Sequence, residues 1–312
     1  MDYNLCMRFN NLRSYLPDDL SKGTTSDINT LGNIKNYCSN RKSGGTECKT
    51  DLDKINGGCI WLFEQLFVKN KIKNINIVGY IMIWLSYMLS IKNIKEFKNL
   101  NEFYNKHIEN KPYYINCDNN GTDCSKSLKE ITGYANYKEI IDKKKEFLNI
   151  NFEDVSKLYD AFKSLCIMYT EISVSDRNDK KYLENAKKFV EKYENLKNDS
   201  NNTKDSAYYQ VLSTLSNDYN NFKKYCIRIN DNCSDIPLLS DTKTTQISEP
   251  SSETSPELSF EVTSSSSITN KLIPVLSIIG VIGFLLGISY KYSLFGFRKR
   301  TPKQHLREKI KK

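Results

Sequence analysis

The stretch NINIVGYIMIWLSYMLSI, residues Asn74–Ile91, contains no charged side chain and is bounded by Lys73 and Lys92. Its apolar residues lie all around a helix rather than along one face, which is typical of a helix buried on every side. Its length of 18 residues would also suit a second membrane span. Polar residues such as Asn76 and Ser86 dilute it, however, so we interpret it as the central buried helix of a bundle.

The segments on either side of this stretch carry amphipathic helical patterns. In each of them apolar residues recur at intervals of three and four, which predicts helices with one buried face. The first pattern stops at Pro17, and Thr50 and Asp53 resemble a capping box at the start of the second. Alternation with a period of two is scarcely found, so the predicted fold class is an all-α helical bundle. The five patterns are Leu5–Leu16, Ile55–Leu66, Val155–Tyr169, Leu183–Leu196 and Val211–Phe222.

Nine cysteines lie in the same region, all before residue 234. Six of them form three pairs that are close in sequence and flank turn-forming residues, at spacings of ten or seven residues. Such spacings favour loop-closing disulfides over a zinc site, which would more often show CxxC knuckles. Disulfides in turn favour a body that lies outside the cytosol. The pairs are Cys38 with Cys48, Cys117 with Cys124, and Cys226 with Cys233.

Three cysteines remain, Cys6, Cys59 and Cys166, and each lies in a helical pattern. Because nine is an odd number, two of the three can pair and one then stays free. The spacing does not decide which two these are.

The helical patterns end before Pro237. Residues 237–269 include 16 Ser or Thr and five acidic residues, so too little apolar surface remains to offset chain entropy. We therefore predict a disulfide-braced helical ectodomain over residues 1–236 and a disordered stalk over residues 237–270. A flexible coil of this length separates its ends by roughly 30 Å, which would hold the ectodomain off a membrane.

Residues Leu272–Tyr290, LIPVLSIIGVIGFLLGISY, are 19 residues without a charge. As a helix they would span roughly 28 Å, the thickness of a hydrocarbon core. A single transmembrane helix is therefore predicted over residues 271–290. The first twenty residues lack the apolar region of a signal peptide. Either the span doubles as the targeting signal or it anchors a cytosolic body, and the cysteines favour the first.

Most of the formal net charge of +9 lies after this span. Residues 291–312, which include Arg298, Lys299 and Arg300, carry a net charge of +8, whereas residues 1–290 carry +1. By the positive-inside rule this basic tail is cytosolic, and the N-terminal body lies on the other side of the membrane. A nearly neutral body also argues against binding to nucleic acid.

The sequence contains no recognisable catalytic, cofactor-binding or metal-binding motif. Phosphate-binding glycine loops and the HExxH and GxSxG motifs are missing. His107 has no second metal ligand beside it, so we interpret it as a surface residue. Glu153 and Asp154 are interpreted as part of a solvated face. We expect no enzymatic activity, no cofactor and no small-molecule substrate.

Five segments that together extend over nearly the whole chain form a distinctive set. They are LCMRFNNLRSYLPDDL (residues 5–20), GGTECKTDLDKINGGCIWLFEQ (44–65), YDAFKSLCIMYTE (159–171), YYQVLSTLSNDYNNFKKYC (208–226) and the juxtamembrane block YKYSLFGFRKR (290–300). The set resembles the Plasmodium interspersed repeat (PIR) proteins, in particular the branch from rodent malaria parasites. The juxtamembrane block is its most specific part.

This resemblance implies a multigene family of variant antigens, exported to or displayed around the infected red cell, with an all-helical, disulfide-bonded ectodomain and no enzymatic activity. Many relatives lack a cysteine at the position of Cys59, which makes Cys59 the candidate free thiol. Cys6 and Cys166 are then the remaining pair that can form a disulfide. Relatives often have proline where this chain has Ser39. No binding motif transfers from the family.

Two functions agree with these observations. The first is a displayed variant surface antigen with a role in host interaction or immune evasion, whose partner would be a host cell-surface or serum protein. The alternative is a structural or trafficking component of parasite-derived internal membranes. We expect a host protein to bind loops distant from the stalk. Because the stalk follows Cys233, the polar loops Asn119–Asp123 and Asn198–Lys204 are predicted to lie at that distant end.

Overall fold

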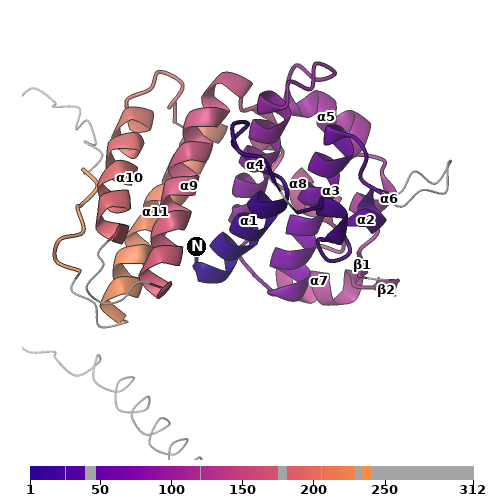
Figure 1. Ribbon diagram of the computed structural model, residues 1–312, viewed down its shortest axis with the longest axis horizontal. Coiled ribbons are helices and arrows are strands. Elements are labelled where there is room, and N and C mark those ends of the chain that lie inside the picture. Colours follow the sequence, from indigo (N-terminus) through magenta and orange to yellow (C-terminus); the bar gives the residue numbers. More distant parts are fainter. Residues whose placement is uncertain are drawn as a thin grey trace, which may run out of the picture. The chain divides into compact units, whose positions relative to one another are not determined.

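The computed structural model describes residues 1–24, 26–38, 47–119, 121–174, 181–204, 206–228 and 233–240. These residues form a helical bundle (Figure 1). Its α-helices are α1 (Tyr3–Tyr15), α2 (Ile34–Tyr37), α3 (Asp51–Phe63), α4 (Val78–Ile91), α5 (Leu100–His107), α6 (Pro112–Ile115), α7 (Ser125–Thr132), α8 (Tyr137–Asp142), α9 (Phe152–Val174), α10 (Lys181–Lys197) and α11 (Ala207–Arg228). Shorter elements are the 3-10 helices η1 (Ile28–Thr30), η3 (Ile75–Ile77) and η4 (Lys145–Asn149), the π-helix η2 (Glu64–Lys69), and the strands β1 (Asp118–Asn119) and β2 (Thr122–Asp123).

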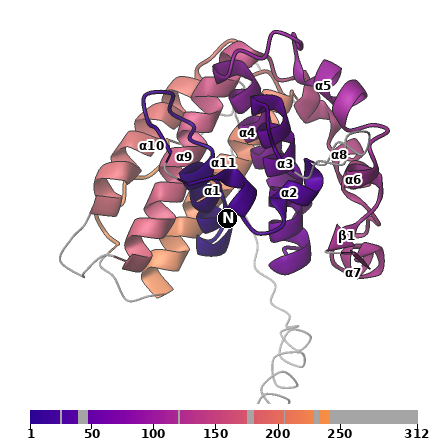
Figure 2. The ribbon, with the colours of Figure 1, turned by 45° about the vertical axis from the view of Figure 1, so that its right-hand side comes forward.

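Helix α4 lies at the centre of the bundle and packs against α3 and α9 (Figures 1 and 2). Eleven of its 14 residues are buried. The ring of Tyr80 stacks on Phe162 of α9 at a centroid distance of 4.6 Å, and Tyr87 stacks on Tyr159 at 4.3 Å. The prediction of a central buried helix is therefore confirmed from Val78 onward. Among the described residues, no helix combines the length and the apolar character needed to cross a membrane.

The amphipathic patterns also form helices, as predicted. Helices α9, α10 and α11 lie side by side (Figures 1 and 2), and α9 contacts both α10 and α4. The capping box at the start of α3 is confirmed, because the side chains of Thr50 and Asp53 each accept a hydrogen bond from the other's backbone N–H. Helix α3 then passes directly into the π-helix η2, for which the sequence carries no signal that we recognise.

Within the described ranges, one short β-ladder departs from the all-α prediction. Strands β1 and β2 have two residues each and pair antiparallel, with Asp118 opposite Asp123. The ladder lies on the opposite side of the molecule from α10 (Figure 1). Polar backbone groups of a tight loop that no helix covers can pair with each other in this way.

After Cys233 the chain turns back along the bundle. The Tyr219 hydroxyl of α11 donates a hydrogen bond to the Pro237 carbonyl at 2.7 Å. The Lys197 ammonium at the end of α10 donates to the Ser240 carbonyl at 3.0 Å, and the Ser240 N–H donates to Oε1 of Glu194 at 3.2 Å. We call residues 233–240 the return segment.

The return segment corrects the expected position of the chain exit. Ser240 lies beside the end of α10, next to Asn198–Lys204, whereas Cys226 lies at the other end of α11. With 22 residues, α11 is about 33 Å long, so these two ends of the bundle are far apart. The prediction that Asn198–Lys204 are distant from the exit is therefore wrong.

The predicted span Leu272–Tyr290 and the basic tail with Arg298, Lys299 and Arg300 lie outside the described residues. Of the predicted stalk, the structure describes only residues 237–240, and these contact α10 and α11.

Gly58 provides a test of the contact between α3 and α4. A methyl group on its Cα would lie 2.9 Å from the Trp84 ring and 3.4 Å from Leu12. We expect Gly58→Ala to lower the free energy of unfolding by about 1–3 kcal/mol, because the added methyl group must displace side chains that are buried. Thermal or denaturant unfolding measures the change. Gly23→Ala is the control, since nothing lies within 4 Å of that position. Equal stability of the Gly58→Ala variant and the wild type would contradict this packing.

Candidate functional site

Two disulfides close short loops. Cys117–Cys124 closes the β1–β2 hairpin with its Cα atoms 5.1 Å apart, and Cys226–Cys233 joins the end of α11 to the return segment at 6.1 Å. Each encloses few residues, so each lowers the conformational entropy of only a short loop in the unfolded chain.

A third disulfide, Cys38–Cys48, joins the end of α2 to the segment before α3, with a Cα–Cα distance of 4.9 Å. It lies directly against Gly57 of α3, where an added Cβ would come within 2.7 Å of Cys38 Sγ. A glycine is therefore required for this close approach. All three pairs expected from spacing are joined in the structure.

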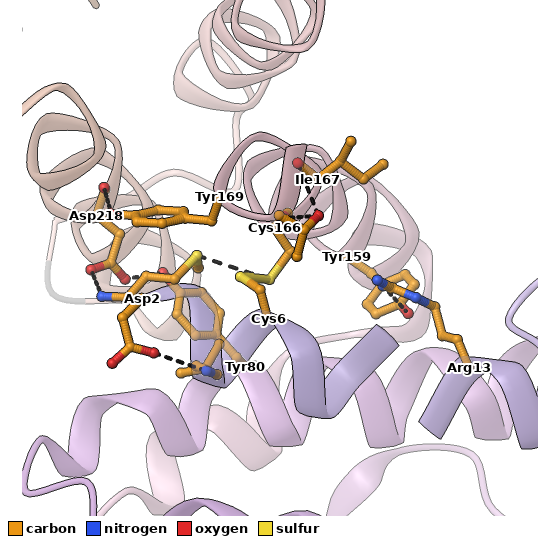
Figure 3. The surroundings of a disulfide bond; sticks show 12 residues. Asp2, Cys6, Arg13, Tyr80, Tyr159, Cys166, Ile167, Tyr169 and Asp218 are labelled. Carbon is orange, nitrogen blue, oxygen red and sulfur yellow. Dashed lines mark hydrogen bonds and ion pairs between the residues drawn. A yellow bond between two sulfur atoms is a disulfide. The ribbon is translucent and has the colours of Figure 1, made fainter. Parts of the chain in front are cut away.

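The fourth disulfide, Cys6–Cys166, joins α1 to α9 across a sequence separation of 160 residues (Figure 3). Both cysteines are fully buried, and their Cα atoms are 5.0 Å apart. Of the three cysteines without a close partner in sequence, the structure joins these two and leaves Cys59 free. This disulfide is a cross-link through the core, so it fixes the position of α1 on the bundle.

A buried ion pair holds the same end of α1 (Figure 3). The amino group of Met1 contacts Oδ1 of Asp218, and Oδ2 of Asp218 accepts a hydrogen bond from the Tyr80 hydroxyl at 2.7 Å. The Tyr169 hydroxyl donates to the Asp218 carbonyl at 3.0 Å. Burial, together with the Asp218 charge, raises the pKa of Tyr80 well above its usual value, so this hydroxyl remains a donor. The contacts connect α1, α4, α9 and α11 at one point.

Sequence reasoning missed Asp218, although a signal is present. Asp218 follows Leu215 by three residues and precedes Phe222 by four, so it lies on the apolar face of α11. A carboxylate on a buried face requires a partner. Its partners come from the start of the chain and from α4, and no local pattern could identify them.

Cys59 is buried in α3, away from solvent. Desolvation raises the pKa of its thiol to about 12. Because the thiolate is the reactive form of cysteine, this thiol is inert while the protein is folded. Cys59 acts as a small apolar residue of the core.

His107 is placed differently from our sequence interpretation, which took it for a surface residue. Its ring stacks on Phe103 at a centroid distance of 5.0 Å and meets Phe97 edge-on at 5.3 Å, and its Nε2 atom is buried without a hydrogen-bond partner. Desolvation, assisted by two nearby lysines, lowers the pKa of His107 to about 4. The side chain is therefore a neutral part of an aromatic cluster.

The position of Asp154 also differs from our sequence interpretation, which placed it on a solvated face. It is buried, and its Oδ2 accepts a hydrogen bond from Nδ2 of Asn201 at 2.9 Å. Glu153 beside it is exposed, as predicted. Asp154 thus ties the start of α9 to the loop between α10 and α11. In the part of the chain that the structure describes, no three His, Cys, Asp or Glu residues are grouped so as to hold a metal ion.

Two comparisons with known proteins give matches. A family model described as "Plasmodium variant antigen protein Cir/Yir/Bir" matches residues 6–291. A solved structure, "Structure of a Plasmodium PIR protein ectodomain", is 31% identical in sequence and superimposes with a TM-score of 0.56. The match covers 77% of this chain and 99% of that one. No curated protein matches the chain.

The disulfide framework can be tested by counting thiols. Thiol tagging of unreduced, folded protein should label no cysteine, because Cys59 is buried and protonated. After denaturation without reductant we expect one tag, on Cys59, and after reduction nine. Mass spectrometry counts the tags. More than one tag before reduction would contradict the framework of four disulfides.

The neutral His107 predicts a loss of stability in mild acid. The unfolded chain binds a proton at this residue below its usual pKa of 6.5, whereas the folded chain does so only near 4. The neutral state of His107 therefore contributes fully to the free energy of unfolding above pH 6.5, and this contribution is lost as the pH falls towards 4. Because the ring is only about half buried, we expect a loss of about 1 kcal/mol between pH 7 and pH 5.

His107→Phe should keep the ring contacts and remove this loss, as denaturant titrations at the two pH values would show. The change His305→Gln, in the tail, is the control for removal of a histidine and should leave the loss unchanged. Identical pH dependence of His107→Phe and the wild type would contradict the assigned environment.

Proposed function

Because this chain belongs to the Plasmodium variant antigen family Cir/Yir/Bir, we propose that it is a membrane-anchored variant surface antigen of the infected red cell. The family match over residues 6–291 is the observation that carries this proposal. The helical, disulfide-bonded ectodomain is consistent with it and is similar to the solved PIR ectodomain. Membership of a variant antigen family supports a role at a surface.

We further propose the arrangement by which the antigen is displayed. Residues 1–236 form the ectodomain, 237–270 the stalk, 271–290 the transmembrane helix and 291–312 the basic cytosolic tail. The uncharged stretch Leu272–Tyr290 and the charge of the residues after it support the span and its orientation. The four disulfides support an ectodomain outside the cytosol, since reducing compartments disfavour them.

The proposed role is non-enzymatic and works through the outer surface of the ectodomain. The sequence lacks recognisable catalytic motifs, and its one free thiol is buried and protonated. A bundle of this kind acts by binding, and a host cell-surface or serum protein is the proposed partner. Host interaction or evasion of antibodies is then the benefit of display.

Surface display is tested with an antibody raised against residues 1–236. It should label intact, unpermeabilised infected cells, because the proposed orientation places these residues outside. An antibody against residues 298–312 is the matched control and should label only after permeabilisation. Labelling of the ectodomain only after permeabilisation would favour the other candidate, a structural or trafficking component of internal parasite-derived membranes.

A further inference from the structure

A groove lies where the start of α1 meets the end of α11. Its cavity volume is about 570 Å³. The walls combine tyrosine rings with basic side chains, and the residues that matter here are Asp2, Tyr3, Tyr169, Lys224, Tyr225 and Arg228. We call this cavity the terminal groove.

The terminal groove has an excess of positive charge. Lys224 and Arg228 are exposed, and neither forms an ion pair within the part of the chain that the structure describes. Arg228 instead lies over the ring of Tyr225, with its guanidinium carbon 5.3 Å from the ring centroid. Among the described residues that line the groove, the single acid is Asp2, which accepts a hydrogen bond from the Leu5 N–H at 2.8 Å as the N-cap of α1. The described part of the wall therefore offers two cations and one carboxylate, which caps α1.

The floor of the groove is fixed before any partner binds. The Tyr169 hydroxyl is held by the Asp218 carbonyl, and the amino group of Met1 is neutralised by the Asp218 carboxylate (Figure 3). The disulfide Cys6–Cys166 prevents α1 from moving away from α9. A site that is rigid in the free protein loses little entropy on binding, so its contacts contribute more fully to affinity.

The groove also lies far from the chain exit. Lys224 and Arg228 are in the last turns of α11, whereas Ser240 contacts Lys197 at the other end of the helical layer. If the ectodomain is displayed as proposed above, the terminal groove lies at the end of α11 opposite to Ser240, the last stalk residue that the structure describes. This placement rests on the proposed function, but the chemistry of the groove does not.

We propose that the terminal groove binds an acidic peptide segment of a partner protein. Lys224 and Arg228 are four residues apart on one helix, which separates them by about 6 Å along its axis. Two carboxylates of one peptide can pair with them together, whereas a carboxylated sugar offers a single carboxylate per residue. Ile227, which precedes Arg228 and is 61% exposed, does not line the groove, but a peptide longer than the groove can make an apolar contact with it, as protein partners do.

The test uses the full-length chain in detergent micelles and a fluorescent decapeptide of alternating glutamate and serine. Anisotropy should report saturable binding that weakens as salt is added, because the contacts are ionic. The double change Lys224→Glu with Arg228→Glu should weaken binding by at least about tenfold. Lys223→Glu is the matched control, since Lys223 is the next residue on the same helix and does not line the groove, and it should change binding by less than about twofold.

A second double variant, Lys224→Gln with Arg228→Gln, removes the two charges without adding repulsion and should also weaken peptide binding. Thermal unfolding verifies that each variant is folded. Absence of peptide binding, or equal weakening by Lys223→Glu, would overturn the proposal. Binding of N-acetylneuraminic acid at the groove in place of the peptide would overturn it in favour of a sugar ligand. Failure of surface labelling with intact peptide binding would instead reject only the display proposal.

Discussion

The burial of α4 is the constraint on which the rest of the bundle depends. A helix without a single charge gains most when every side is covered by protein, and α3 and α9 provide that cover. Two tyrosine hydroxyls of α4 find their hydrogen-bond acceptors outside the helix. The Tyr80 hydroxyl donates to Asp218, and the Tyr87 hydroxyl donates to the Asp18 carbonyl at 3.0 Å. The aromatic stacks on α9 fix the relative register of the two helices. Helices α1 and α11 both pack against α9.

Covalent and ionic contacts hold helix α1, which does not pack closely against α4. Helix α1 has 13 residues and begins two residues after the first residue of the chain, and helix ends open locally more readily than helix centres. The disulfide to α9 and the ion pair to Asp218 hold that start from two sides. By contrast, the three short-range disulfides brace individual loops, and of these Cys38–Cys48 packs directly against Gly57 of α3.

The sequence predicted features whose cause is local. Helical periodicity located α1, α3, α9, α10 and α11, and the capping box located the start of α3, because neighbouring residues decide both. Spacing within turns likewise indicated the short disulfides. The sequence could not place Asp218, Asp154 or His107, since their burial depends on residues far away in the chain. The return segment has no helical periodicity, and it is held by the buried side chain of Ile236 and by contacts such as that of Tyr219 with Pro237.

The return segment has a mechanical consequence. A pull on the chain at Ser240 reaches the contacts with α10 first and the contact with Tyr219 next. When these have broken, the released chain extends by about 25 Å, and the tension then enters α11 at Cys226 through a covalent link. Ile236 of this segment and its neighbour Tyr219 are buried, whereas Ser240 is exposed, so the exposed end of the segment gives way before the buried part. A bundle tethered in this way releases its return segment under a brief force before the tension reaches a helix of its core.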